Sequence, residues 1–180
     1  LSTGHLNVGG FYKVTSGQAA PVITGYEKLS EIVKRTLPDL DFVSARGRGW
    51  AKLVSDTGSM QVAIGGLNIS AEPGFRDVIK VVQGKLADLS QSGSVLIFQQ
   101  QAKKLGVGVG DSLVISAETP RGVSNTLDVR VVAIAQDLGF MSLWNVFIPN
   151  ESLRMLEQLN SDTTGALHVY LKDISKIPFA

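Results

Sequence analysis

The sequence predicts an α+β protein with two lobes, and its length and the distribution of its patterns support this. The chain has 180 residues, enough for one ordinary domain or for two small subdomains. Helical and extended patterns are mixed, without the strict alternation that marks a parallel α/β sheet. The middle, roughly residues 60–140, is rich in strand patterns, whereas each end contains one clear helix beside strands. We therefore expect an α/β lobe formed by both chain ends and a β-rich lobe inserted between them.

The composition is that of a packed globular domain. Apolar residues make up 44% of the chain and charged residues 18%, which suits a hydrophobic core and argues against disorder. No run of about 18 apolar residues occurs, so we expect no transmembrane helix within this stretch, and residue 1 does not open a signal peptide. The formal net charge of +1 gives no electrostatic reason to expect nucleic-acid binding. The lack of cysteine excludes disulfides, zinc–thiolate sites and thiol nucleophiles.

The first elements are a strand and an amphipathic helix. Residues 4–14 carry aromatic and β-branched side chains and predict a strand. Thr24 is a candidate N-cap, because Glu27 follows three residues later as in a capping box. Apolar residues then recur at helical spacing until Pro38, which ends the helix. We expect this helix to cover one face of a sheet.

A hairpin and a helical segment follow. Residues 41–55 predict one strand, residues 56–59 a turn and residues 60–67 the returning strand, which together form a β-hairpin. Residues 75–82 have helical spacing, and residues 84–92 form a connection anchored by its leucines.

The central unit is the clearest pattern in the chain. Residues 95–98 are an apolar run with strand composition, and residues 99–105 are helix formers without a breaker. Gly106 is a natural residue to end that helix, and residues 112–116 predict the next strand.

Three glycines in this unit imitate a phosphate-binding loop. Gly106, Gly108 and Gly110 follow a helix and open a strand, whereas a dinucleotide-binding loop follows a strand and opens a helix. We therefore interpret them as turn formers and expect the Asp111 side chain to accept hydrogen bonds from amides of the turn.

The C-terminal part contains three strands and one helix. Residues 126–136 predict a long strand that becomes continuously apolar, as expected for burial on both faces. Residues 145–148 predict a short strand, and Asn150 is a candidate N-cap for a helix over residues 151–159. Residues 166–172 predict the final strand.

The segment 137–144 holds the only candidate contact site. Four large apolar residues, Phe140, Met141, Leu143 and Trp144, occur there in a glycine-containing loop. Such residues are more often tucked into the core, and the alternative is an exposed patch that contacts a partner. Tryptophan and methionine are common anchors at interfaces, so a partner contact is first expected here.

Other candidate sites are weak. His5 and His168 lie in separate predicted strands without a carboxylate at metal-ligand spacing, and no Gly-x-Ser-x-Gly motif occurs. We therefore expect no catalytic, cofactor-binding or metal site. Arg46, Arg48 and Trp50 form the one local basic and aromatic cluster. Two arginines are few for an anion or nucleobase site, so a solvated strand face is the expected reading.

Five segments of the chain occur in an order typical of one known family. In QAKKLGVGVGDSL, residues 102–113 follow the run "lAkkLgvkvGDtl". The other segments are residues 4–8, residues 65–68 with Glu72, residues 146–149 with Leu153 and Leu156, and residues 167–173. The ordered set resembles the periplasmic core domain of MacB-type ABC-transporter permeases, a family that includes MacB, the lipoprotein-releasing permeases LolC and LolE, and FtsX-like permeases. The resemblance covers nearly the whole chain.

The resemblance implies a fold, a location and partners. The fold would be a Porter-like α/β lobe from residues 1–58 and 145–180, with an inserted Sabre-like β-rich lobe from residues 59–144. The domain would lie on the periplasmic side of a bacterial inner membrane and have no catalytic activity or cofactor. Its implied partners are a second permease subunit, a cytoplasmic ATP-binding subunit, and a periplasmic adaptor or lipoprotein. Its implied role is mechanotransmission, which couples cytoplasmic ATP hydrolysis to periplasmic motion in efflux or lipoprotein release.

Two other classes of protein stay open at this point. A free-standing periplasmic binding module would need its own signal sequence and no flanking membrane helices. A hydrolase would need histidine, carboxylate and serine side chains that converge in a pocket, which the chain order does not suggest.

Overall fold

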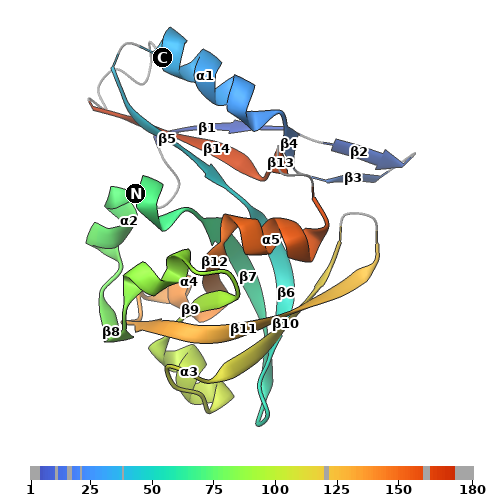
Figure 1. The fold of residues 1–180 in the computed structure, drawn as a ribbon, viewed down its shortest axis with the longest axis vertical. Helices are drawn as coiled ribbons and strands as arrows, with labels where there is room; N and C mark the ends of the chain where they lie inside the picture. The colour runs from blue at the N-terminus through green and yellow to red at the C-terminus, as the bar shows by residue number, and fades with distance from the viewer. Residues whose placement is uncertain are drawn as a thin grey trace.

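The computed structural model describes residues 5–10, 12–15, 18–20, 22–37, 39–119, 122–159 and 163–172. Within these residues helices and strands are mixed, and the strands form one three-stranded sheet, one seven-stranded sheet and two short pairs (Figure 1). The α+β fold class predicted from the sequence is confirmed. None of the helices in these ranges is long and apolar enough to span a bilayer.

The three-stranded sheet brings the two ends of the described chain together. Its order is β1 (Leu6–Gly9), β14 (Ala166–Leu171) and β5 (Leu40–Arg46), and both pairings are antiparallel. Helix α1 (Tyr26–Thr36) packs on β5 with a half-buried face, so the prediction that this helix covers a sheet is confirmed. Its predicted N-cap is wrong: Gly25 is the cap, at φ +65°, because Thr24 is used in a strand pair. The short pairs are β2 (Tyr12–Thr15) with β3 (Gln18–Ala20) and β4 (Ile23–Thr24) with β13 (Thr163–Thr164).

The seven-stranded sheet closes on itself. Its strands, in spatial order, are β10 (Ser112–Glu118), β6 (Arg48–Val54), β7 (Ser59–Leu67), β12 (Asn145–Pro149), β9 (Ser94–Phe98), β11 (Ser124–Ala135) and β8 (Val81–Gly84). Because β10 also pairs with β11, the first six strands form a barrel, and β8 is added at its side. The predicted hairpin is confirmed as β6 and β7.

Helices close the barrel and extend the core. One hydrophobic cluster combines inward-facing strand residues with side chains of α3 (Gln99–Leu105) and α5 (Asn150–Glu157), which lie below and above the barrel in Figure 1. A second cluster lies outside the barrel under η1 (Ile69–Ala71), α2 (Pro73–Val78) and η2 (Leu86–Ser90). Strand β9 contributes to both clusters, and all five of its residues are buried. The predicted strand, helix and strand of the central unit are confirmed, with Gly106 at φ +65° after α3.

One predicted strand is two strands. The pattern over residues 41–55 suggested a single element, but β5 and β6 belong to different sheets and Gly47 separates them. A Cβ atom at Gly47 would lie 2.4 Å from Cδ2 of Leu153 in α5, so the backbone can cross under the helix only without a side chain. The carbonyl of Gly47 also accepts a hydrogen bond from the amide of Gly66, at 3.0 Å.

Three further predictions need correction. The helical pattern over residues 75–82 ends at Val78, because the chain turns there into β8. The segment 137–144 contains a short helix, α4 (Phe140–Trp144). Asn150 is not an N-cap, because its side chain is directed toward β5 instead.

The predicted lobe boundaries, residues 58/59 and 144/145, stay a prediction. We note that the seven-stranded sheet crosses both of them, since β6 and β12 each pair with β7. If the two sheets define the lobes, the boundary lies at the crossing near Gly47 and at the end of α5.

Candidate functional site

The apolar residues of α4 are exposed. Phe140, Met141 and Trp144 expose 73%, 58% and 44% of their surface. These three residues are therefore not packed in the core, which is the commoner outcome. Leu143 is half-buried. The rings of Phe140 and Trp144 lie 6.5 Å apart between centroids and are tilted by 55°. Four residues proposed from sequence thus belong to one short helix, three of them exposed.

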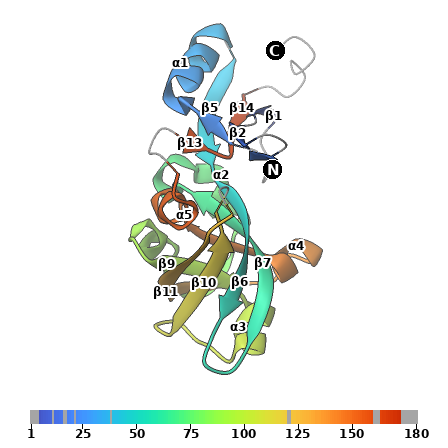
Figure 2. The same ribbon diagram turned by 90° about the vertical axis from the view of Figure 1, so that its right-hand side faces the viewer.

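A fifth large side chain extends this surface. Trp50 of β6 is 70% exposed and pairs with Ala63 of β7, which in turn pairs with Asn145 of β12. Adjacent strands lie about 4.8 Å apart, so the backbones of Trp50 and Asn145 are roughly 10 Å apart. Since α4 ends at Trp144 and lies beside β7 (Figure 2), the elements that carry these side chains are neighbours on the barrel. We call Trp50, Phe140, Met141 and Trp144 the aromatic patch.

Hydrogen bonds hold α4 in place beneath its exposed rings. The Ser142 hydroxyl is buried, donates to the Gly139 carbonyl at 2.7 Å and accepts from the Leu138 amide at 3.0 Å. The side-chain Nδ2 of Asn145 donates to the carbonyl of Met141 at 2.6 Å. Three of the four residues of the aromatic patch are therefore carried by a helix that these hydrogen bonds hold in place.

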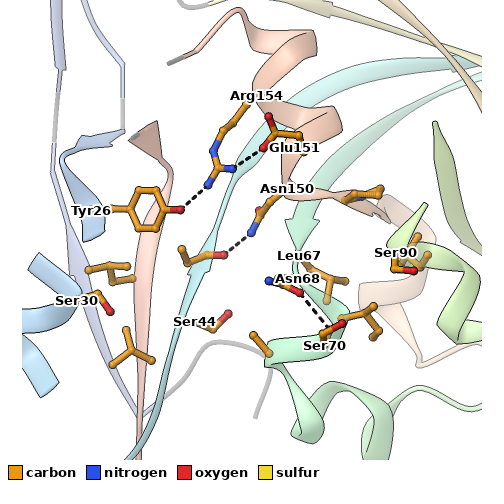
Figure 3. Close-up of a pocket in the computed structure, with 17 residues that line it drawn as sticks. Tyr26, Ser30, Ser44, Leu67, Asn68, Ser70, Ser90, Asn150, Glu151 and Arg154 are labelled. Carbon is orange, nitrogen blue, oxygen red and sulfur yellow. Dashed lines mark hydrogen bonds and ion pairs between the residues drawn. The ribbon is translucent and has the colours of Figure 1, made fainter. Parts of the chain in front are cut away.

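A polar cleft lies where the two sheets meet. It has a volume of about 480 Å³ and is lined by α1, β5, the end of β7, η1 and the start of α5 (Figure 3). On one wall Arg154 forms an ion pair with Glu151 at 2.9 Å and donates to the Tyr26 hydroxyl at 3.1 Å. On the other wall the Asn68 side chain accepts from the Ser70 amide at 3.2 Å. Neither histidine lines this cleft.

A buried ion pair lies beside the cleft. Glu72 accepts hydrogen bonds from Nε of Arg46 at 2.8 Å and from the same guanidinium through Nη2, and the Ser44 hydroxyl donates to it at 2.5 Å. All three residues are buried. The prediction of a solvated strand face is therefore wrong for Arg46, although Arg48 and Trp50 are exposed.

The two histidines have separate surroundings. Nδ1 of His5 accepts a hydrogen bond from the Leu171 amide at 2.8 Å, which supports the end of the three-stranded sheet. His168 is fully buried, with Nε2 3.3 Å from Nη2 of Arg48. Burial lowers the pKa of His168 to about 4, and the charges of Arg46 and Arg48 act in the same direction. Among the described residues no group of three or more acidic or histidine side chains is arranged to hold a metal ion.

Glu157 of α5 is buried against the backbone of β6. A Cβ atom at Gly49 would lie 2.3 Å from Oε1 of Glu157, so the carboxyl group occupies the space that this glycine leaves. No cation of the described residues forms an ion pair with it. Burial raises the pKa of Glu157 to about 7.

This pKa predicts a pH dependence of stability. Because the folded pKa is above the unfolded value of 4.5, the folded state binds more protons than the unfolded state, and stability falls as pH rises from 4.5 to 7. We expect Glu157→Gln to raise the free energy of unfolding at pH 8 by about 2 kcal/mol, less than the full shift implies because the amide is buried too. Urea unfolding at pH 5 and pH 8 measures this, with Glu151→Gln on the exposed side of the same helix as control. An equal effect of Glu157→Gln at both pH values would contradict the shifted pKa.

Comparisons with solved structures give the fold a clear set of neighbours. The chain is similar to the extracellular domain of the noncanonic ABC-type transporter YknZ from Gram-positive bacteria, with a TM-score of 0.62 and 16% identity over 88% of this chain and 78% of that one. It is also similar to the periplasmic region of MacB from Actinobacillus actinomycetemcomitans, with a TM-score of 0.57 and 16% identity. This match covers 81% of this chain and 64% of that one. A domain assigned to a permease protein from Porphyromonas gingivalis is similar too, with a TM-score of 0.55 and 15% identity. This match covers 93% of this chain and 71% of that one.

These likenesses concern the fold. The resemblance inferred from the sequence is confirmed at that level, because the chain shares the fold of extracytoplasmic domains of ABC-type transporters. No family model matches the chain, and no curated protein matches it.

Proposed function

We propose that the chain is an extracytoplasmic domain of an ABC-type transporter permease. The observation that carries this proposal is the likeness of fold to the extracellular domain of YknZ over 88% of the chain. In the proposed assembly a second permease subunit lies beside this one, and a cytoplasmic nucleotide-binding subunit hydrolyses ATP. The domain transmits the resulting motion and contacts a substrate or partner protein outside the cytoplasm.

The position of the first and last described strands supports attachment to a membrane. β1 and β14, the first and last strands of the described chain, pair with each other in the three-stranded sheet, with Leu6 opposite Val169. The barrel lies at the other end of the molecule from this sheet, and α4 lies at the side of the barrel (Figures 1 and 2). Two membrane helices joined near β1 and β14 would therefore hold one end of the domain and leave the barrel free to meet a partner.

The gene on both sides of this segment tests the proposal. We expect one apolar segment of about 20 residues shortly before residue 1 and about three more after residue 180, as in a permease. A cleavable signal peptide upstream and a polar end downstream would contradict membrane attachment and favour a free-standing binding module.

The aromatic patch is the proposed contact for a partner protein with an apolar surface. Three aromatic rings and a methionine exposed on neighbouring elements are unusual for a protein surface without a partner. Tryptophan and other aromatic residues also dominate the binding energy of many interfaces.

Cross-linking in the full transporter can identify this contact. The chain has no cysteine, so Met141→Cys gives a single reactive site within it. We expect a reagent with one thiol-reactive end and one photoreactive end to join Met141→Cys to another protein, with a yield that changes when ATP hydrolysis is blocked. The matched control is Val123→Cys, which is similarly exposed, at 53%, in the β10–β11 connection. Equal yields from both positions would show that the patch is not a preferred contact.

A further inference from the structure

The edge of β5 that faces the cleft has unpaired backbone groups. β5 pairs with β14 along one edge only, and within the described residues no other strand pairs with it, although the end of β7 contacts it. The direction of the backbone groups of β5 can be inferred from the direction of those of β14, the strand that pairs with it. The Val169 carbonyl and the Leu171 amide of β14 are directed toward β1 and His5, so the alternate residues of β14 face β5.

This orientation determines which groups of β5 are unpaired. His168 of β14 is opposite Ser44, so Ser44 bonds to β14, whereas Val43 and Ala45 direct their amides and carbonyls away from it. The Ala45 carbonyl accepts a hydrogen bond from the Asn150 side chain at 2.6 Å, which agrees with this direction. Val43 and Ala45 both line the cleft (Figure 3).

The side chain of Asn150 makes the two hydrogen bonds to β5 that one backbone residue of a neighbouring strand would make. Its side-chain nitrogen donates to the Ala45 carbonyl, and its side-chain oxygen accepts from the Gly47 amide at 3.1 Å. A strand residue paired at this place would offer the same donor and acceptor through its backbone. The Asn150 side chain does not bond to the amide of Ala45 or to the amide and carbonyl of Val43. These three backbone groups face the open cleft.

We propose that the cleft binds an extended peptide segment of a partner protein, which adds as a strand to the edge of β5. A peptide backbone supplies the alternating donors and acceptors that Val43 and Ala45 need.

The charges of the cleft suit such a ligand. Glu151 and Arg154 neutralise each other, so the lining favours uncharged peptide side chains. Leucines and serines make up much of the remaining wall, namely Leu67, Leu89, Leu167, Ser30, Ser70 and Ser90. The inference depends on this edge and not on the proposed transport function.

A proline substitution tests the backbone pairing directly. Val43→Pro removes the outward amide without breaking a bond to β14, and proline is tolerated on strand edges. Val43→Thr is the matched control, because it keeps the amide and nearly the same shape. A displayed library of random heptapeptides is selected on the unaltered chain. We expect the selected peptides to bind Val43→Pro about ten-fold more weakly and Val43→Thr about equally, as the loss of one hydrogen bond implies.

Amide hydrogen exchange of the unaltered chain gives an independent measurement. We expect the amides of Val43 and Ala45 to exchange quickly in the free chain and slowly once a selected peptide is bound. Enrichment of no peptide, or equal binding to the proline variant, overturns the proposal. Slow exchange of Val43 in the free chain also overturns it, because the edge is then covered by the chain's own residues or by a second copy.

Discussion

Replacing Glu72 by alanine is expected to lower the free energy of unfolding by about 3–5 kcal/mol. The substitution removes the carboxylate that the buried guanidinium of Arg46 contacts, and a buried charge that loses its partner is strongly destabilising. It also removes the acceptor of the buried Ser44 hydroxyl. Chemical denaturation, followed by the fluorescence of the two tryptophans, measures the change.

Two further variants separate charge from shape at this site. Asp77→Ala removes an exposed carboxylate from α2, the helix that follows Glu72, and should change stability by less than about 0.5 kcal/mol. The double variant Arg46→Met with Glu72→Leu removes both charges, and we expect it to recover most of the loss. If Glu72→Ala alone costs less than about 1 kcal/mol, the ion pair does not contribute to stability in the way we describe.

Replacing Leu153 by alanine is expected to cost about 2–5 kcal/mol, the range for buried leucines. Leu153 is 1% exposed, and its side chain fills the space above both Gly47 and Gly66, where the chain passes from one sheet to the other. The cavity left by the substitution would lie at the crossing itself, where backbone movement to fill it is restricted by the hydrogen bond between the same two glycines.

Met155 of the same helix provides the control for this substitution. Its side chain is 49% exposed, so Met155→Ala removes a side chain of similar size from α5 with little loss of burial. We expect it to change stability by less than about 1 kcal/mol, with the same slope of unfolding free energy against denaturant. Similar losses from both variants would mean that the helix, and not the packing over the crossing, determines the effect.

The elements predicted best from the sequence are those whose patterns are local. Residues 94–118 form the expected strand, helix and strand, because apolar composition, helix propensity and Gly106 all indicate the same structure. The turn role of Asp111 is also confirmed, since its carboxylate accepts from the Gly108 amide at 2.7 Å. These features depend on residues a few positions apart, and one sequence is enough to recognise them.

The candidate site was only partly predictable. The four apolar residues of 137–144 pointed to this segment as a candidate, but whether they are buried depends on what the rest of the chain places over α4. Trp50 joins them only because β12 pairs with β7 of the β6–β7 hairpin, although β12 is far from that hairpin in sequence. The unpaired edge of β5 could not be inferred at all, because the sequence of one strand does not determine which strands pair with it.

By itself the sequence determined the fold class and most of the helices and strands. The tertiary structure alone decided that Gly47 divides one extended pattern between two sheets, that Arg46 is buried beside Glu72, and that Asn150 bonds to β5 instead of capping its own helix. The physical reason is the range of the interactions. Periodicity and turn formation involve neighbouring residues, whereas the burial of a charge or the pairing of a strand edge depends on groups that only folding brings together.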